Sequence, residues 1–103
     1  MNKTEADFSA ALTENMKKAG AVLSADFSRE LAQIEKNGAL RWVQTLLKRG
    51  IETPGFDQLA ERGQLSLSVE AVVVRAAFGA LFTDDEINLC FDRLCEQGYY
   101  NVR

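Results

Sequence analysis

The sequence offers few residues with which to catalyse a reaction. Histidine is absent from all 103 residues, which removes the commonest general base and the commonest metal ligand. Serine and cysteine nucleophiles normally need an adjacent base, and no serine has a lysine three residues later that could replace histidine. Glycine-rich phosphate loops and dinucleotide-binding fingerprints are also missing. We therefore expect no enzymatic activity, no cofactor and no bound metal.

The two cysteines, Cys90 and Cys95, are five residues apart on one expected helix. That spacing separates them by about 140° around the helix axis, so they cannot face one site or bridge each other. We expect both to be small buried side chains with reduced thiols. A four-cysteine zinc site shared by two copies would normally use closer pairs. Reduced thiols, no apolar signal run at the N-terminus and no apolar run of about 18 residues predict a cytoplasmic protein.

Three consecutive acids, Asp84, Asp85 and Glu86, follow Thr83. Threonine with glutamate three residues later is a capping box, and further acids in a first turn complement the helix dipole. Residues 82–94 resemble the first helix of an EF-hand, but the twelve-residue oxygen-rich calcium loop is absent. We therefore interpret these acids as helix-capping residues rather than a metal or acid–base site.

A basic cluster surrounds the single tryptophan. Arg41, Lys48 and Arg49 lie near Trp42 on one expected helix, and such groups can bind phosphate while an indole ring stacks on a base. Arg41, Trp42, Lys48 and Arg49 are therefore our candidate patch for an anionic ligand. The alternative is a solvated helix face beside a core tryptophan.

Residues 59–75 resemble a helix-turn-helix, with Ala60, Gly63 and a serine-capped second helix. The resemblance implies an alternative function, a DNA-binding transcriptional regulator with a degenerate motif around residues 56–78. Valines 72–74 stand where side chains that read bases would be expected. The net charge of −3 also has the wrong sign for a general nucleic-acid binder. Nucleic acid is therefore an unfavoured partner.

The elements that position these residues are helical, beginning with a long N-terminal segment. Its apolar residues recur every three or four positions from Phe8 to Ile34, which is the helical period. The period predicts one amphipathic helix over 4–36, about 50 Å long at 1.5 Å per residue. The alternative is two helices that meet at a bend near Gly20. A domain of this size has a radius of gyration of about 13 Å and could not cover such a helix alone.

Four more helices are expected, at 39–49, 54–62, 68–81 and 84–97. The 54–62 helix would be capped by Thr53, and the 68–81 helix is apolar almost all round, so it should be the buried centre. The stretch 64–74 could instead contain a short strand, because its valines favour strands. Tyr99, Tyr100 and Val102 form an apolar ending that we expect to pack down. The predicted fold is a single all-α domain over 1–103, with a helical region 1–37 and a compact core 38–103.

The function that follows is protein–protein binding by a non-enzymatic protein, which we expect to form a homodimer, to bind another protein, or to do both. Residues 1–50 carry a net +2 and residues 51–103 a net −5, and opposite charges favour association between copies. Size and acidity suit a small accessory or regulatory protein of bacterial or phage type. No small-molecule substrate or membrane partner is evident. The residues expected at the interface are Phe8, Leu12, Met16, Leu23, Phe27, Leu31 and Ile34.

Overall fold

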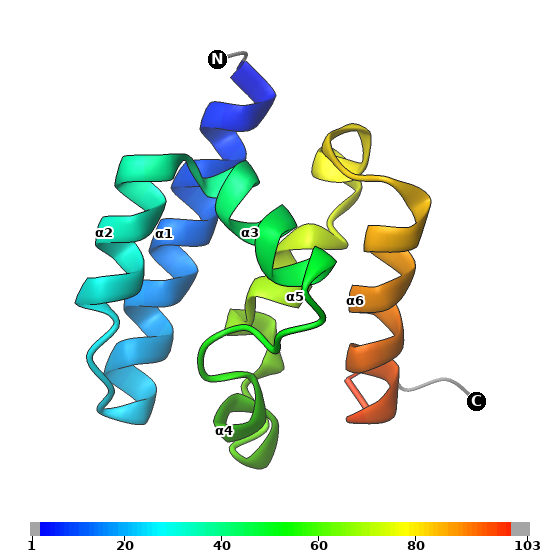
Figure 1. Ribbon diagram of the computed structural model, residues 1–103. Coiled ribbons are helices and arrows are strands. Elements are labelled where there is room, and N and C mark those ends of the chain that lie inside the picture. The colour runs from blue at the N-terminus through cyan, green and yellow to red at the C-terminus, as the bar shows by residue number, and fades with distance from the viewer. Residues whose placement is uncertain (1–2, 100–103) are drawn as a thin grey trace.

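The computed structural model describes residues 3–99, and every regular element in that range is helical (Figure 1). This confirms the all-α prediction, and residues 64–74 contain no strand. The α-helices are α1 (Lys3–Leu23), α2 (Ser28–Asn37), α3 (Ala39–Lys48), α4 (Phe56–Glu61), α5 (Val69–Val73) and α6 (Asp84–Glu96). Two 3₁₀ helices, η1 (Leu65–Leu67) and η2 (Ala76–Leu81), flank α5.

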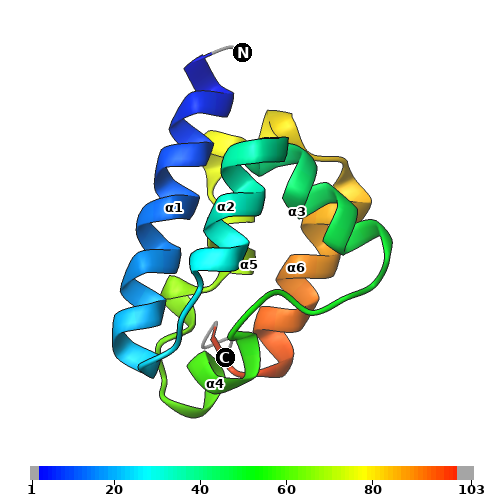
Figure 2. The ribbon, with the colours of Figure 1, turned by 60° about the vertical axis from the view of Figure 1, so that its left-hand side comes forward.

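The N-terminal segment is a helical hairpin rather than one helix. The prediction of a continuous helix over 4–36 is wrong, and the break lies at residues 24–27 rather than at Gly20. Ser24 takes a positive φ of 53°, and the Asp26 carboxylate accepts hydrogen bonds from the backbone N–H and hydroxyl of Ser28. These local bonds stabilise a turn, so α2 runs back beside α1 (Figure 2). The longest extent of the described structure is 39 Å, well short of the helix that was expected.

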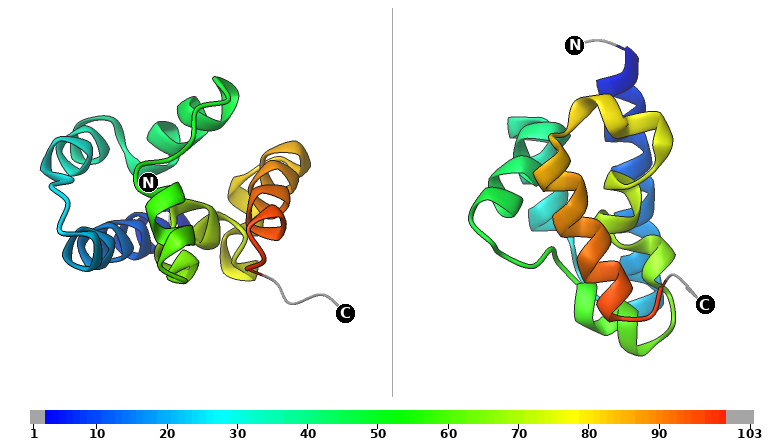
Figure 3. Two further views of the ribbon diagram at one scale, coloured as in Figure 1. Left: turned by 90° about the horizontal axis from the view of Figure 1, so that it is seen from below. Right: turned by 90° about the vertical axis from the view of Figure 1, so that its right-hand side faces the viewer.

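The core is built around α5, which lies between α1 and α6 (Figures 1 and 3). All five residues of α5 are buried, as expected for the centre of the fold. The expected helix 68–81 is nevertheless split, because Arg75 is extended and η2 follows it. This change of direction brings Phe78, like Phe82, against Phe8, with each pair packed edge-to-face at ring centroid distances of 5.3 Å.

Local capping signals decide where several helices begin. Ser68 accepts a hydrogen bond from the backbone N–H of Ala71 and begins α5. The expected cap at Thr53 is wrong: α4 begins after Gly55, which takes a left-handed φ of 78°. A Cβ at Gly55 would lie 3.0 Å from the Phe27 ring, so this turn also packs closely against the hairpin.

None of the described helices is both long enough and apolar enough to cross a bilayer. Of the apolar C-terminal residues that we expect to pack down, Tyr99 is exposed, while Tyr100 and Val102 lie outside the described residues.

Candidate functional site

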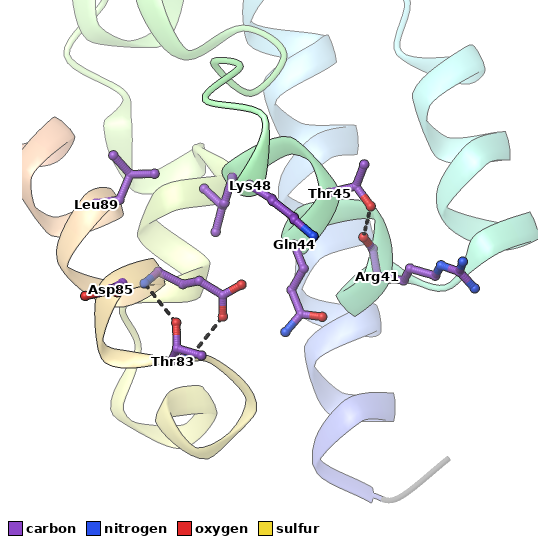
Figure 4. A pocket seen from close by; sticks show the side chains of 9 residues that line it. Arg41, Gln44, Thr45, Lys48, Thr83, Asp85 and Leu89 are labelled. Carbon is purple, nitrogen blue, oxygen red and sulfur yellow. Dashed lines mark hydrogen bonds between the residues drawn. The ribbon is translucent and has the colours of Figure 1, made fainter.

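A cleft of about 510 Å³ lies between α3 and the first turns of α6 (Figure 4). We call it the α3–α6 cleft. Its lining residues come from two segments far apart in sequence. They are Arg41, Gln44, Thr45, Leu47, Lys48, Thr83, Asp85, Glu86 and Leu89.

One wall of the α3–α6 cleft is basic because of how α3 packs. Its inward face buries Trp42, Val43 and Leu47, which fixes the rotation of the helix about its axis. Arg41 and Lys48 are seven residues apart, two turns on one helix face. Both line the cleft and both are exposed.

The opposite wall is held by the predicted capping box at the start of α6. The Thr83 hydroxyl accepts from the Glu86 backbone N–H at 3.2 Å, and the Glu86 carboxylate accepts from the Thr83 backbone N–H at 2.8 Å. Asp85 is exposed in the same turn, and Leu89 is half-buried one turn further along. The cap therefore fixes the Glu86 side chain, and the exposed Asp85 lies beside it in the lining of the cleft.

The charges on the two walls have opposite signs and do not pair with each other. Within residues 3–99, Arg41, Lys48 and Asp85 form no ion pair. The lining hydroxyls are already engaged, because Thr45 donates to the Arg41 carbonyl oxygen at 2.8 Å and Thr83 serves as the cap. The arrangement suits an apolar group flanked by charges of both signs, and it presents no activated nucleophile.

The structure places half of the predicted patch for an anionic ligand in the cleft. Arg41 and Lys48 line the α3–α6 cleft, whereas Arg49 is exposed outside its lining. Trp42 is only 8% exposed, and its Nε1–H donates to the Gln33 side-chain oxygen at 3.2 Å. The expectation that Trp42 could stack on a base is therefore wrong, since its ring is packed into the core.

The predicted interaction stripe on the N-terminal helices faces inward. Because the hairpin folds the stripe onto the other helices, four of its residues are buried and the other three pack against the core while half-buried. The buried residues are Phe8, Leu12, Met16 and Ile34; the half-buried ones are Leu23, Phe27 and Leu31. In this fold the stripe is thus an internal packing surface. A second hollow of about 430 Å³, the hairpin groove, lies between α1 and α2, and its lining includes Lys17, Leu31 and Glu35.

The segment that resembles a helix-turn-helix has no exposed recognition helix. Its second helix, α5, is five residues long and buried throughout. A recognition helix must present several side chains to a DNA groove, which α5 does not do in this fold.

A buried ion pair that joins α5 to α6 is not predicted by the sequence patterns. Glu70 is fully buried, and its carboxylate accepts from the Thr53 hydroxyl at 2.6 Å and from the Arg93 guanidinium at 3.1 Å. Arg93 has a side chain only 14% exposed. These hydrogen bonds connect three segments, which are the loop that precedes α4, helix α5 and helix α6. The available signal was a single acid inside an apolar helix, because a buried charge needs a partner.

Two neighbouring groups have shifted pKa values. Burial raises the pKa of Cys90 to about 12, and the negative charge of Glu70 contributes, so the thiol stays protonated at neutral pH. Partial desolvation and the nearby negative charge of Asp57 raise the pKa of Glu52, an exposed residue, above its ordinary value. Both cysteines are free thiols; Cys90 is buried as expected, and Cys95 is half-buried.

Among the described residues, no group of three or more histidine, cysteine or acidic side chains is placed to hold a metal ion. Comparisons with protein-family models, with curated proteins and with solved structures found no match to this chain.

Proposed function

We propose that the protein is non-enzymatic and acts through protein–protein binding, as a homodimer whose interface contains the α3–α6 cleft. A cytoplasmic accessory or regulatory role of bacterial or phage type remains part of this proposal. Two free thiols support a reducing compartment.

The observation that carries the proposal is the charge pattern of the α3–α6 cleft. A homodimer with two-fold symmetry uses the same patch on both copies, so the patch must complement itself. Basic side chains on one wall, acidic side chains on the other and leucines between them meet that requirement. Since Arg41, Lys48 and Asp85 have no ion-pair partner within residues 3–99, they are available to a second copy.

Other features also support binding rather than chemistry. The lining hydroxyls of Thr45 and Thr83 are engaged in local hydrogen bonds, and the Cys90 thiol is buried. The DNA-binding alternative has less support, because α5 is buried and Trp42 is packed into the core.

The test is the molecular mass in solution, measured by light scattering and sedimentation equilibrium up to roughly 100 µM, where even weak specific dimers form. We expect about twice the chain mass of 11.4 kDa. Leu89→Asp should give a folded monomer, since it puts a charge into the α3–α6 cleft. The matched control is Leu31→Asp in the hairpin groove, where the leucine is also half-buried; if folded, it should remain a dimer. A wild-type monomer at every concentration would refute the proposal.

A further inference from the structure

We infer that the two copies pair about a two-fold axis running along the mouth of the α3–α6 cleft, which places α3 of each copy over the N-terminal turn of α6 of the other. The inference rests on the proposed homodimer and adds the pairing: Arg41 and Lys48 of one copy meet Asp85 of the second copy.

The choice of axis follows from the two walls. An axis along the cleft exchanges the walls, so the basic wall of one copy faces the acidic wall of the other. An axis across the cleft would place each wall against the same wall of the other copy. Arg41 and Lys48 would then face the same cations, and like charges brought together across an interface oppose association. The charge pattern therefore selects the axis along the cleft.

The pairing must cover more surface than the lining of the cleft alone. A standard interface buries about 800 Å² on each partner, roughly an eighth of the 6322 Å² that this chain exposes. Arg41 and Gln44 also line an adjacent hollow that reaches Glu5 and residues 37–40. The concave surface therefore continues around α3, and the outward faces of α3 and α6 add to it. Leu89, half-buried in each copy, would be covered by the pairing.

The experiment exchanges the charges of the two walls. The double variant Arg41→Glu/Lys48→Glu makes both walls acidic. The variant Asp85→Lys reverses the charge at position 85 and leaves Glu86 in place as the capping residue. Each variant alone should dimerise at least tenfold more weakly than the wild type. An equimolar mixture should restore a dimer containing one copy of each, which native mass spectrometry resolves from either homodimer.

Matched controls separate this pairing from general effects of charge. Lys17→Glu/Arg29→Glu makes the same double reversal on the α1–α2 hairpin, and Asp7→Lys reverses one exposed acid on α1. Both controls should dimerise within about twofold of the wild type, as expected for exposed charges outside an interface. Circular dichroism establishes that each protein is folded before masses are compared.

The outcomes distinguish the inference from the proposed function. A wild-type monomer contradicts both. A wild-type dimer whose charge variants still dimerise, with no preference for the mixed pair, overturns the axis and leaves the homodimer intact. If the variants do not fold, the salt dependence of the wild-type dimer tests the pairing.

Raising sodium chloride from roughly 50 to 500 mM shortens the Debye length several-fold and should therefore raise the dissociation constant of the wild-type dimer at least threefold. A dissociation constant that is unchanged or tighter at high salt would overturn the pairing.

Discussion

The buried ion pair between Glu70 and Arg93 gives the sharpest prediction about stability. Arg93→Met keeps a long apolar side chain against α5 but removes the guanidinium that lies 3.1 Å from the Glu70 carboxylate. A fully buried carboxylate is then left without its charge partner. Breaking a buried pair in this way typically costs about 3–5 kcal/mol.

The structure refines the expected loss in the free energy of unfolding. Arg93 is only 14% exposed on its side chain, so solvent screens the pair little. The Thr53 hydroxyl still donates to the carboxylate at 2.6 Å, which offsets part of the loss. We therefore expect Arg93→Met to lower the free energy of unfolding by about 3 kcal/mol. Thr53→Val should lower it by about 1–2 kcal/mol. A chain of this size has a total stability of roughly 5–15 kcal/mol, so the arginine variant loses a large fraction of it.

The assay is urea unfolding at one fixed protein concentration, followed by Trp42 fluorescence, because this is the only tryptophan and it is buried. The double variant Glu70→Leu/Arg93→Met is the control. Replacing both charges by apolar groups removes the uncompensated charge, so most of the stability should return. A loss below about 1 kcal/mol for Arg93→Met, or no recovery in the double variant, would refute the argument.

Three further predictions follow from single positions. The Cys90 thiol, buried and with its pKa raised to about 12, should resist a thiol reagent at pH 8 until urea unfolds the chain; rapid labelling of that peptide in the native protein would contradict its burial. The raised pKa of Glu52 means that its stabilising contribution, present below the ordinary pKa of 4.5, is lost as pH rises through the folded pKa. Glu52→Gln should therefore raise the melting temperature at pH 7, because it removes the desolvated charge and its repulsion from Asp57. The same substitution should leave the melting temperature unchanged below pH 4.5. Equal gains in melting temperature at both pH values would exclude a charge effect. Gly55→Ala should destabilise by about 1–3 kcal/mol in urea unfolding, because φ is 78° and the new Cβ would meet the Phe27 ring; a stability within a few tenths of a kcal/mol of the wild type would count against a strained turn.

Local signals in the sequence predicted the parts of the fold that depend on neighbouring residues. The capping box at Thr83 and Glu86 needs only residues three positions apart, and it is present. The sequence leaves Ser66 and Ser68 both open as the cap of the buried helix α5, and the structure has Ser68 there. The hairpin turn at residues 24–27 was missed because the apolar period continues through it. Phe27 and Leu31 keep the helical spacing although the chain has reversed direction, and a serine at positive φ has no sequence signal.

The candidate site was predicted only in part for a similar reason. The sequence pattern identifies Arg41 and Lys48 as part of a basic patch, but it indicates only a helix-capping role for the acidic residues on the opposite wall of the cleft. Glu86 does both, since it caps α6 and lines the cleft. The two walls meet only through packing of α3 against α6, across more than 30 residues of sequence. The partners of Glu70 are likewise distant in sequence, so its charge signalled a partner without identifying it.

The most direct test of the account is an isotope-filtered NMR experiment on a dimer assembled from labelled and unlabelled chains. It detects contacts that connect one copy to the other. We predict intermolecular contacts between the Leu89 methyl groups of one copy and α3 side chains of the other, including Thr45. Intermolecular contacts confined to the hairpin groove at Leu31, or the absence of any intermolecular contact, would contradict the claim that this protein dimerises through the α3–α6 cleft.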